Sequence, residues 1–226
     1  MKKTLITLMA AASCAMGDAI TIATTDNYAT TPNDSFNNNY GLTFQIANAL
    51  TLGRAETSYT GEIPASVVLD SLEVKFRESA SYDYITAFIV DTANSNKILA
   101  VSDQVTDANG GEFIKFDFDD VTISKESRYV VYFNTTETGV ASSAINTTYT
   151  TEMVSSVGYD RYVVCDGEAA TSAKAAYWGF RTNEDTAVSG YSLYATQMKL
   201  NLIPEPATAT LSLLALCGLC ARRRRK

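Results

Sequence analysis

Carboxylates are the side chains best suited to acid–base chemistry in this sequence, because it contains no histidine. Without imidazole, the chain can form neither a Ser-His-Asp nor a Cys-His catalytic pair, and it has no histidine metal ligand. Two carboxylates facing each other across a cleft could still hydrolyse a glycosidic bond. The densest local group is Asp117, Asp119 and Asp120, whose spacing favours a solvent-facing strand position followed by a turn. We therefore predict no catalytic residue and keep a carbohydrate-active enzyme with paired carboxylates as the alternative.

Oxygen ligands for a hard cation gather around one glycine turn. Asp107, Asn109 and Glu112 flank Gly110-Gly111, and carboxylate and amide oxygens are the ligands that Ca²⁺ takes. Their spacing does not match the EF-hand loop, and Asp-x-Asn-Gly is ordinary turn chemistry. These three residues are calcium candidates, but the sequence as a whole predicts no metal or cofactor.

Aromatic residues near position 178 suggest a second kind of site. Trp178 is the single tryptophan, and it lies between Tyr177 and Phe180. An aromatic face offers a sugar ring apolar area beside a polar edge, so Trp178 and Tyr177 are candidates for ligand binding. Strand alternation would place Trp178 and Phe180 on one face and Tyr177 on the other, and one of these faces is expected to be core. A buried structural tryptophan is the competing interpretation.

The cysteines predict neither a disulfide nor a zinc site. Cys165 is alone between residues 18 and 203, and we expect it to be a small buried residue because no histidine can activate it. Cys217 and Cys220 form a Cys-x-x-Cys pair, but zinc needs about four ligands and no second pair exists. Small packing residues are the expected role of this pair, with acylation as the alternative.

The elements that would position these residues are predicted to be strands. Period-two alternation marks 72–77 and 114–118, and the pattern shifts at Asp119-Asp120, which indicates a turn or a bulge. Turn-rich intervals separate the segments, and no amphipathic helix is evident. We therefore predict an all-β fold for residues 18–203, an antiparallel β-sandwich that is jelly-roll-like. The other expected strands are 42–47, 84–90, 98–101, 128–133, 162–165, 177–180 and 191–202.

The first residues have the order of a secretory signal peptide. Lys2 and Lys3 precede a short apolar run at 5–12, and Ala15 and Gly17 stand at the cleavage-determining positions. This pattern predicts a signal peptide over residues 1–17. A buried N-terminal helix and a lipoprotein signal acylated at Cys14 are the alternatives.

The last residues form a second targeting segment, which predicts a C-terminal hydrophobic helix. Residues 207–221 carry no charge, and the fifteen residues would span about 22 Å as a helix, against a hydrocarbon core of ~30 Å. Snorkelling by flanking arginines could extend this short span. The cations at 222–226 would stay on the cytoplasmic side, which places the preceding chain outside.

This C-terminal order resembles the PEP-CTERM sorting tail of exported proteins of Gram-negative bacteria. The three parts are Pro204, Glu205 and Pro206, then the apolar segment, then Arg222, Arg223, Arg224, Arg225 and Lys226. The resemblance implies export through the general secretion machinery, temporary tethering in the inner membrane, and processing near Pro204 by a membrane-embedded exosortase. It covers residues 204–226 alone and implies nothing about the fold of the rest. A generic tail-anchor helix is the alternative.

Charge is distributed unevenly along the chain. The whole sequence has a net charge of −7, but residues 18–203 contain 11 Lys and Arg against 24 Asp and Glu, which gives −13. Phosphate binding needs clustered cations, so nucleic acid is excluded as an expected partner, and an anionic membrane surface is disfavoured for this part of the chain.

Two functions from different classes follow from the sequence. The first is a noncatalytic cell-surface or extracellular-matrix protein, sorted by its tail, that acts in adhesion, envelope structure or glycan binding. Extracellular polysaccharide would then be its partner. The second is the secreted carbohydrate-active enzyme described above.

Overall fold

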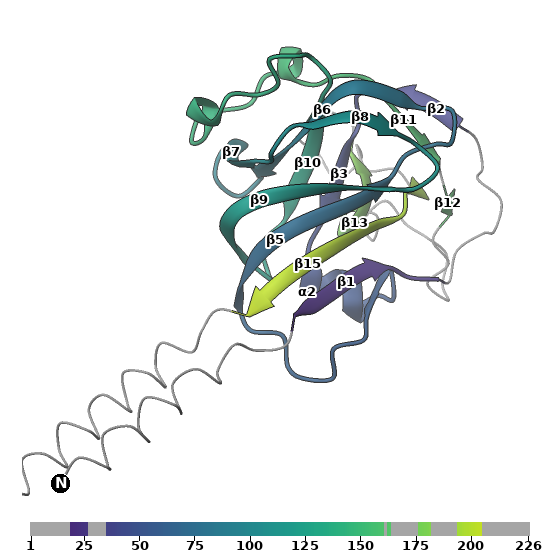
Figure 1. Cartoon of the computed structure of the whole chain (residues 1–226). Helices are drawn as coiled ribbons and strands as arrows, with labels where there is room; N and C mark the ends of the chain where they lie inside the picture. Colours follow the sequence, from purple (N-terminus) through teal and green to yellow (C-terminus); the bar gives the residue numbers. More distant parts are fainter. Residues whose placement is uncertain (1–18, 27–34, 161, 164–175, 182–193, 205–226) are drawn as a thin grey trace, which may run out of the picture.

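The computed structural model describes residues 19–26, 35–160, 162–163, 176–181 and 194–204 (Figure 1). Several features expected from the sequence lie outside these residues. They are the signal peptide (1–17) with Cys14, then Cys165, Glu205 and Pro206, the apolar segment with Cys217 and Cys220, and the cations 222–226.

Five antiparallel strands form the first sheet. Their order is β4-β1-β15-β5-β9, so the first and last of these strands along the chain, β1 and β15, are neighbours. The strand bounds, in the same order, are Ala55–Thr57, Ile20–Thr24, Met198–Pro204, Ser66–Lys75 and Phe113–Ser124.

The second sheet has the order β13-β3-β10-β6-β7, and β8 also pairs with β6. Its bounds are Trp178–Arg181, Gly41–Phe44, Tyr129–Asn134, Ser81–Asp91, Lys97–Val101 and, for β8, Val105–Asn109. Two strand pairs complete the described part: β11 (Val157–Asp160) with β2 (Ser35–Asn38), and β12 (Tyr162–Val163) with β14 (Tyr194–Ala195). The described helices are α2 (Ile46–Thr51) and the short η1 (Ser142–Ala144) and η2 (Thr151–Met153).

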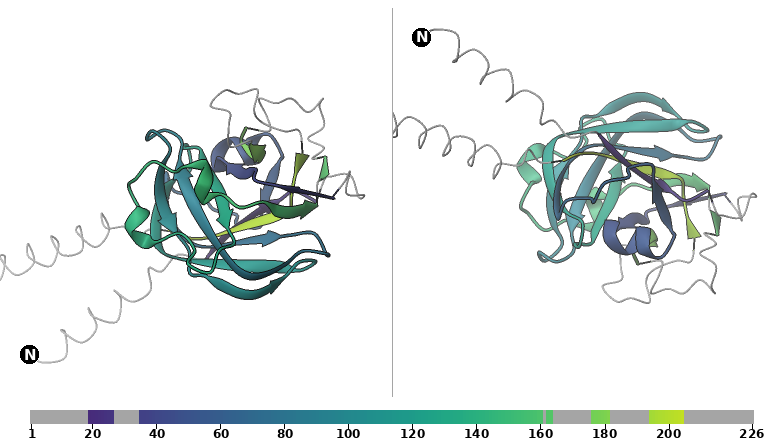
Figure 2. Two further views of the ribbon diagram at one scale, coloured as in Figure 1. Left: turned by 90° about the horizontal axis from the view of Figure 1, so that it is seen from above. Right: turned by 90° about the horizontal axis from the view of Figure 1, so that it is seen from below.

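The main core lies between the two sheets, which form separate layers when viewed from above and below (Figure 2). Alternation in β5 buries Val67, Leu69, Leu72 and Val74 and turns the intervening residues outward. Aromatic rings fill the centre of this core, and Phe76 contacts several of them at centroid distances of 5.1 to 6.3 Å. The domain is therefore an antiparallel β-sandwich, which confirms the coarse fold prediction.

A second, smaller core lies on the outer face of the second sheet. Residues 135–156, which include η1 and η2, cover this face and pack against Phe88, Val130 and Tyr132. Tyr149 stacks on Tyr132 with ring centroids 4.9 Å apart, and their hydroxyl groups are 3.2 Å apart. Because both faces of β10 are covered, all six of its residues are buried.

The register shift expected at Asp119-Asp120 is a bulge inside one long strand. In the pairing of β5 with β9, Leu69 lies opposite Val121 and Ser71 lies opposite Asp117, so three residues of β9 face one of β5. The chain continues as a strand to Ser124 because the extra residues are absorbed without a reversal.

Two other predictions need correction. The expected strand 42–47 ends at Phe44, and α2 begins at Ile46 because Ile46 and Ala49 bury their side chains in the main core. The turn expected around Asp107 to Gly111 is shorter, since Asp107 and Asn109 belong to β8, in which Ala108 and Asn109 pair with β6.

The sandwich has two ends, which we call the terminal pole and the distal pole. At the terminal pole, Ile20 pairs with Leu202, so the described chain enters and leaves the domain side by side. At the distal pole, the turn 76–80 that follows β5 meets the turn 110–112 between β8 and β9.

Candidate functional site

The outer face of the first sheet carries two rows of polar side chains that cross four strands. Pairing aligns Ala23, Lys199, Glu73 and Lys115 in one row. The second row contains Thr21, Asn201, Ser71 and Asp117. We call the seven polar members of these rows the polar ladder.

Asn201 is the central hydrogen-bonding residue of the polar ladder. Its Oδ1 accepts a hydrogen bond from Thr21 Oγ1 at 3.2 Å. Its Nδ2 donates to Glu73 Oε1 at 2.9 Å and to Ser71 Oγ at 3.1 Å. The two neighbouring strands, β1 and β5, therefore hold the Asn201 amide in a fixed orientation, which pre-organises this part of the face.

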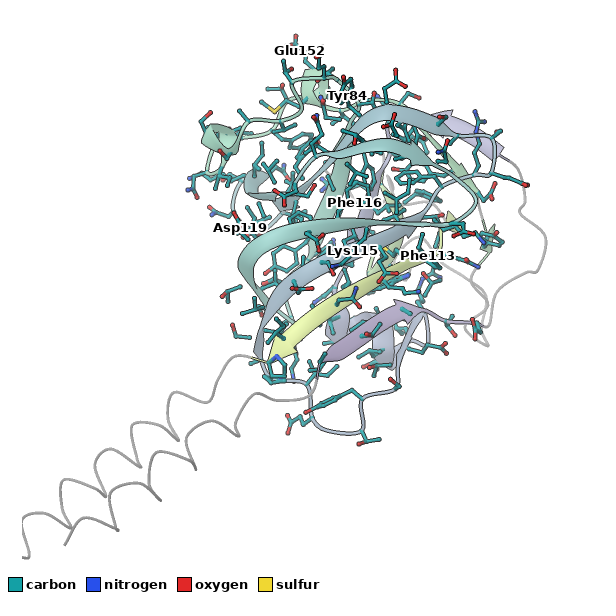
Figure 3. The ribbon with its side chains drawn as sticks, in the orientation of Figure 1. Tyr84, Phe113, Lys115, Phe116, Asp119 and Glu152 are labelled. Atoms are coloured by element: carbon teal, nitrogen blue, oxygen red, sulfur yellow. The ribbon has the colours of Figure 1, made fainter. Side chains whose placement is uncertain are left out.

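The charges of the polar ladder are paired across and along the strands. Lys199 Nζ lies 3.3 Å from Glu73 Oε2 and 3.9 Å from the centre of the Phe113 ring. Lys115 forms an ion pair with Asp117 on the same strand, and this hydrogen bond raises the pKa of the lysine. Phe113, Lys115 and Asp119 lie along β9, where Lys115 and Asp119 are exposed, whereas Phe116 belongs to the core (Figure 3).

This arrangement suits binding better than hydrolysis. Glu73 and Asp117 are diagonal neighbours on β5 and β9, a spacing that could serve a pair of catalytic carboxylates. Each carboxylate, however, already pairs with a lysine on an open sheet face. Apart from Ser71, which is completely buried, the ordered amide, hydroxyl and charged groups can exchange hydrogen bonds with a ligand rich in hydroxyl groups.

The structure does not bring Trp178 to this face, and its burial favours the competing interpretation of a structural tryptophan. Trp178 is completely buried, and its Nε1 donates a hydrogen bond to Thr24 Oγ1 at 3.1 Å. The ring belongs to the main core because β13 aligns Trp178 with Phe44 of β3. Tyr177 is half-buried, and the Arg128 guanidinium lies 5.3 Å from its ring centre.

The calcium candidates lie on the hairpin at the distal pole. Asn109 Nδ2 donates to the Asp107 carbonyl oxygen at 3.1 Å, and Asn109 Oδ1 accepts from Ser81 Oγ at 3.1 Å. The Asn109 side chain therefore braces the hairpin, and Glu112 is exposed beyond it. Within the described part of the chain, no three His, Cys, Asp or Glu side chains are grouped so that they could hold a metal ion.

Sequence reasoning missed two arginines, of which the fold buries Arg54 completely and Arg77 in part. Arg54 is completely buried, and its Nε donates to the Trp178 carbonyl oxygen at 3.0 Å. Arg77 lies at the distal pole with its Nε shielded from solvent. Arg77 follows an alternating strand and therefore looks solvent-facing in the sequence, and no sequence signal marked Arg54, which lies between α2 and β4.

Fold and surface together define a class of protein, an antiparallel β-sandwich with an ordered polar face. Comparisons of the chain with protein-family models, with curated proteins and with solved structures find no match in any of the three. Among the residues that the structure describes, no helix is long and apolar enough to cross a membrane.

Proposed function

We propose that this protein is exported, is sorted through its PEP-CTERM-like tail, and acts at the cell surface or in the extracellular matrix as a noncatalytic, glycan-binding β-sandwich. The tripartite tail at 204–226 carries the sorting part of the proposal. It follows directly on β15, which ends at Pro204, so no linker separates the folded domain from the tail. In the tethered form, the terminal pole would face the inner membrane and the distal pole would point away from it.

Deletion of residues 222–226 tests the sorting proposal, because it removes the cations that would fix the topology of the tail. We expect the deletion to leave unprocessed protein in the membrane fraction, and replacement of Pro204, Glu205 and Pro206 to do the same. The control is a substitution of Lys125, a lysine of the β-sandwich domain, which should leave processing unchanged. Normal processing and release of both tail variants would contradict the proposal.

The strand order supports a jelly-roll-like connectivity within the sandwich. One sheet contains β1, β15, β5 and β9 as neighbours, and the other contains β3, β10, β6 and the pair β7 and β8. Taken in chain order, these strands move between the two sheets in the sequence expected of two Greek keys, with β4 and β13 added at the edges. Jelly rolls include many lectin domains, which is compatible with glycan binding.

The polar ladder supports the glycan-binding part of the proposal. Its amide, hydroxyl and carboxylate groups are held in place by Asn201, and the Phe113 ring lies beside them. We expect Asn201→Ala and Glu73→Gln to weaken retention of the full-length protein on neutral polysaccharide beads. The control is Glu152→Gln, since Glu152 is exposed on the segment that covers the other sheet. If the parent protein binds no polysaccharide, glycan binding is excluded and a structural role is left.

A further inference from the structure

Arg77 carries a positive charge that no acidic group of the described residues neutralises. It follows β5 at the distal pole, and no carboxylate of the described chain forms an ion pair with it, including its neighbour Glu78. Its Nε is buried without a hydrogen-bond partner in this part of the chain, whereas its two terminal nitrogens are not among the buried unpaired atoms. The outer edge of the guanidinium group is therefore open to solvent in a domain that is otherwise acidic.

Gly158 allows Arg77 to hold this position. The Arg77 backbone N–H donates to the Gly158 carbonyl oxygen at 3.1 Å, and the side chain then crosses the glycine. A β-carbon at Gly158 would lie 2.6 Å from Arg77 Nε and 3.0 Å from its Cδ and Cγ. The arginine stem thus occupies the space that any other residue at 158 would need.

Tyr82 places a hydroxyl group next to this arginine. Tyr82 Oη accepts a hydrogen bond from the Gly158 N–H at 2.7 Å, which leaves its own proton available for a ligand. Burial raises the pKa of Tyr82, while the Gly158 hydrogen bond and the Arg77 charge oppose this shift. The hydroxyl group therefore stays protonated at neutral pH and can donate.

Backbone hydrogen bonds join the two turns next to Arg77, 76–80 and 110–112. Gly110 N–H donates to the Ala80 carbonyl oxygen at 2.8 Å, and Gly111 N–H donates to the Phe76 carbonyl oxygen at 3.0 Å. Phe76 also forms a β-bridge with Tyr159. Because these hydrogen bonds fix the backbone around Arg77, its guanidinium group loses little conformational entropy when it binds a ligand.

We propose that Arg77 and Tyr82 form a binding site for the carboxylate group of an acidic sugar, such as a uronic acid in a glycan chain. The planar guanidinium fork matches a carboxylate with two parallel hydrogen bonds. Because residues 18–203 have a net charge of −13, the fitting ligand carries isolated carboxylates on a mostly neutral chain rather than a dense polyanion. The site lies at the opposite pole from the paired residues Ile20 and Leu202. It rests on the proposed glycan binding and deepens it by naming the class of sugar.

Binding of two probes by the full-length protein tests this site. The probes are a glucose oligosaccharide that carries a single glucuronate residue and a neutral glucose oligosaccharide of the same length, compared by isothermal titration calorimetry. We expect Arg77→Met to weaken binding of the glucuronate-bearing probe by about 10-fold or more, because it removes a charge-assisted pair. Arg77→Lys keeps the charge but not the fork, and it should be intermediate. The control Lys97→Met removes a cation from the start of β7 and should bind like the parent.

A second variant changes the position of the Arg77 guanidinium group but keeps its charge. Gly158→Ala displaces the Arg77 stem without removing the guanidinium group, and it should weaken binding of the glucuronate-bearing probe while circular dichroism stays unchanged. Equal binding of the two probes by the parent, or parent-like binding of the glucuronate-bearing probe by the folded Arg77 variants, would overturn the site and leave the polar ladder as the glycan surface. Binding of neither probe by the parent would overturn the site and the proposed glycan binding together.

Discussion

Thr24 joins the two sheets through one buried hydroxyl group. Its Oγ1 accepts hydrogen bonds from Trp178 Nε1 across the sandwich at 3.1 Å and from the Met198 N–H at 3.0 Å. Thr24→Val keeps the shape but leaves two buried donors without this acceptor, so we expect a loss of about 2–4 kcal/mol in the free energy of unfolding. Urea denaturation measures the loss. Thr21→Val, at a half-buried position of the polar ladder, should cost less than about 1 kcal/mol, and a similar cost for both variants would contradict the prediction.

Tyr159 makes the stability of the domain sensitive to alkaline pH. Complete burial raises its pKa well above 10.0, and its hydroxyl group donates to the Tyr40 carbonyl oxygen at 3.0 Å. Below pH 10 both the folded and unfolded states keep the proton, so stability does not change through this group. Above pH 10 the unfolded state releases the proton while the folded state retains it, so the free energy of unfolding must fall.

Substitution of Tyr159 should make the free energy of unfolding fall less steeply above pH 10. We expect Tyr159→Phe to cost about 1 kcal/mol at pH 7, because one hydrogen bond is lost. Between pH 10 and 11.5, the free energy of unfolding measured by urea denaturation should fall less steeply with pH in Tyr159→Phe than in the parent. Tyr82→Phe should have a smaller effect, since the pKa of Tyr82 is raised to a smaller extent. An unchanged slope in Tyr159→Phe would show that other groups control alkaline unfolding.

At the scale of elements, the two turns of the distal pole depend on a close backbone approach. A β-carbon at Gly110 would overlap the Arg77 carbonyl oxygen, which is backbone and cannot rotate away. Gly110→Ala must therefore separate the turn 76–80 from the turn 110–112, and we expect it to cost about 2–3 kcal/mol in urea denaturation. The control is Gly61→Ala, where the nearest atoms belong to the movable Tyr59 ring. A Gly110 variant no less stable than the Gly61 variant would contradict this account of the turns.

The alternation of polar and apolar residues was sufficient to predict the second half of β5 and the first part of β9, because there one face lies in the core and one in solvent. It was not sufficient for α2, since a helix of six residues is too short to show a period. The burial of Trp178 could not be predicted either, because its partner Thr24 is 154 residues away in the sequence. The polar ladder shares this limit, because it depends on how β1, β5, β9 and β15 are aligned.

The whole molecule is closed by the pairing of its outermost described strands. β15 lies between β1 and β5, so the first sheet cannot be completed before residue 204 has joined it. The same pairing places residues 20 and 202 together at the terminal pole and leaves the distal pole, with Arg77, at the opposite end. In the proposed tethered form, this arrangement presents the acidic-sugar site outward without any further domain to position it.

A circular permutant tests this closure. Ile20 and Leu202 are paired neighbours, and adjacent strands lie about 4.8 Å apart, so a short Gly/Ser linker can join residue 204 to residue 19. New ends between Gly61 and Glu62, which are both exposed, should leave the free energy of unfolding within about 1 kcal/mol of the parent domain. Truncation after Gln197 removes β15 and should abolish cooperative unfolding, because β1 and β5 lose their shared neighbour. Circular dichroism and urea denaturation distinguish the two outcomes. A permutant that fails to fold would show that the two chain ends are not held together at the terminal pole.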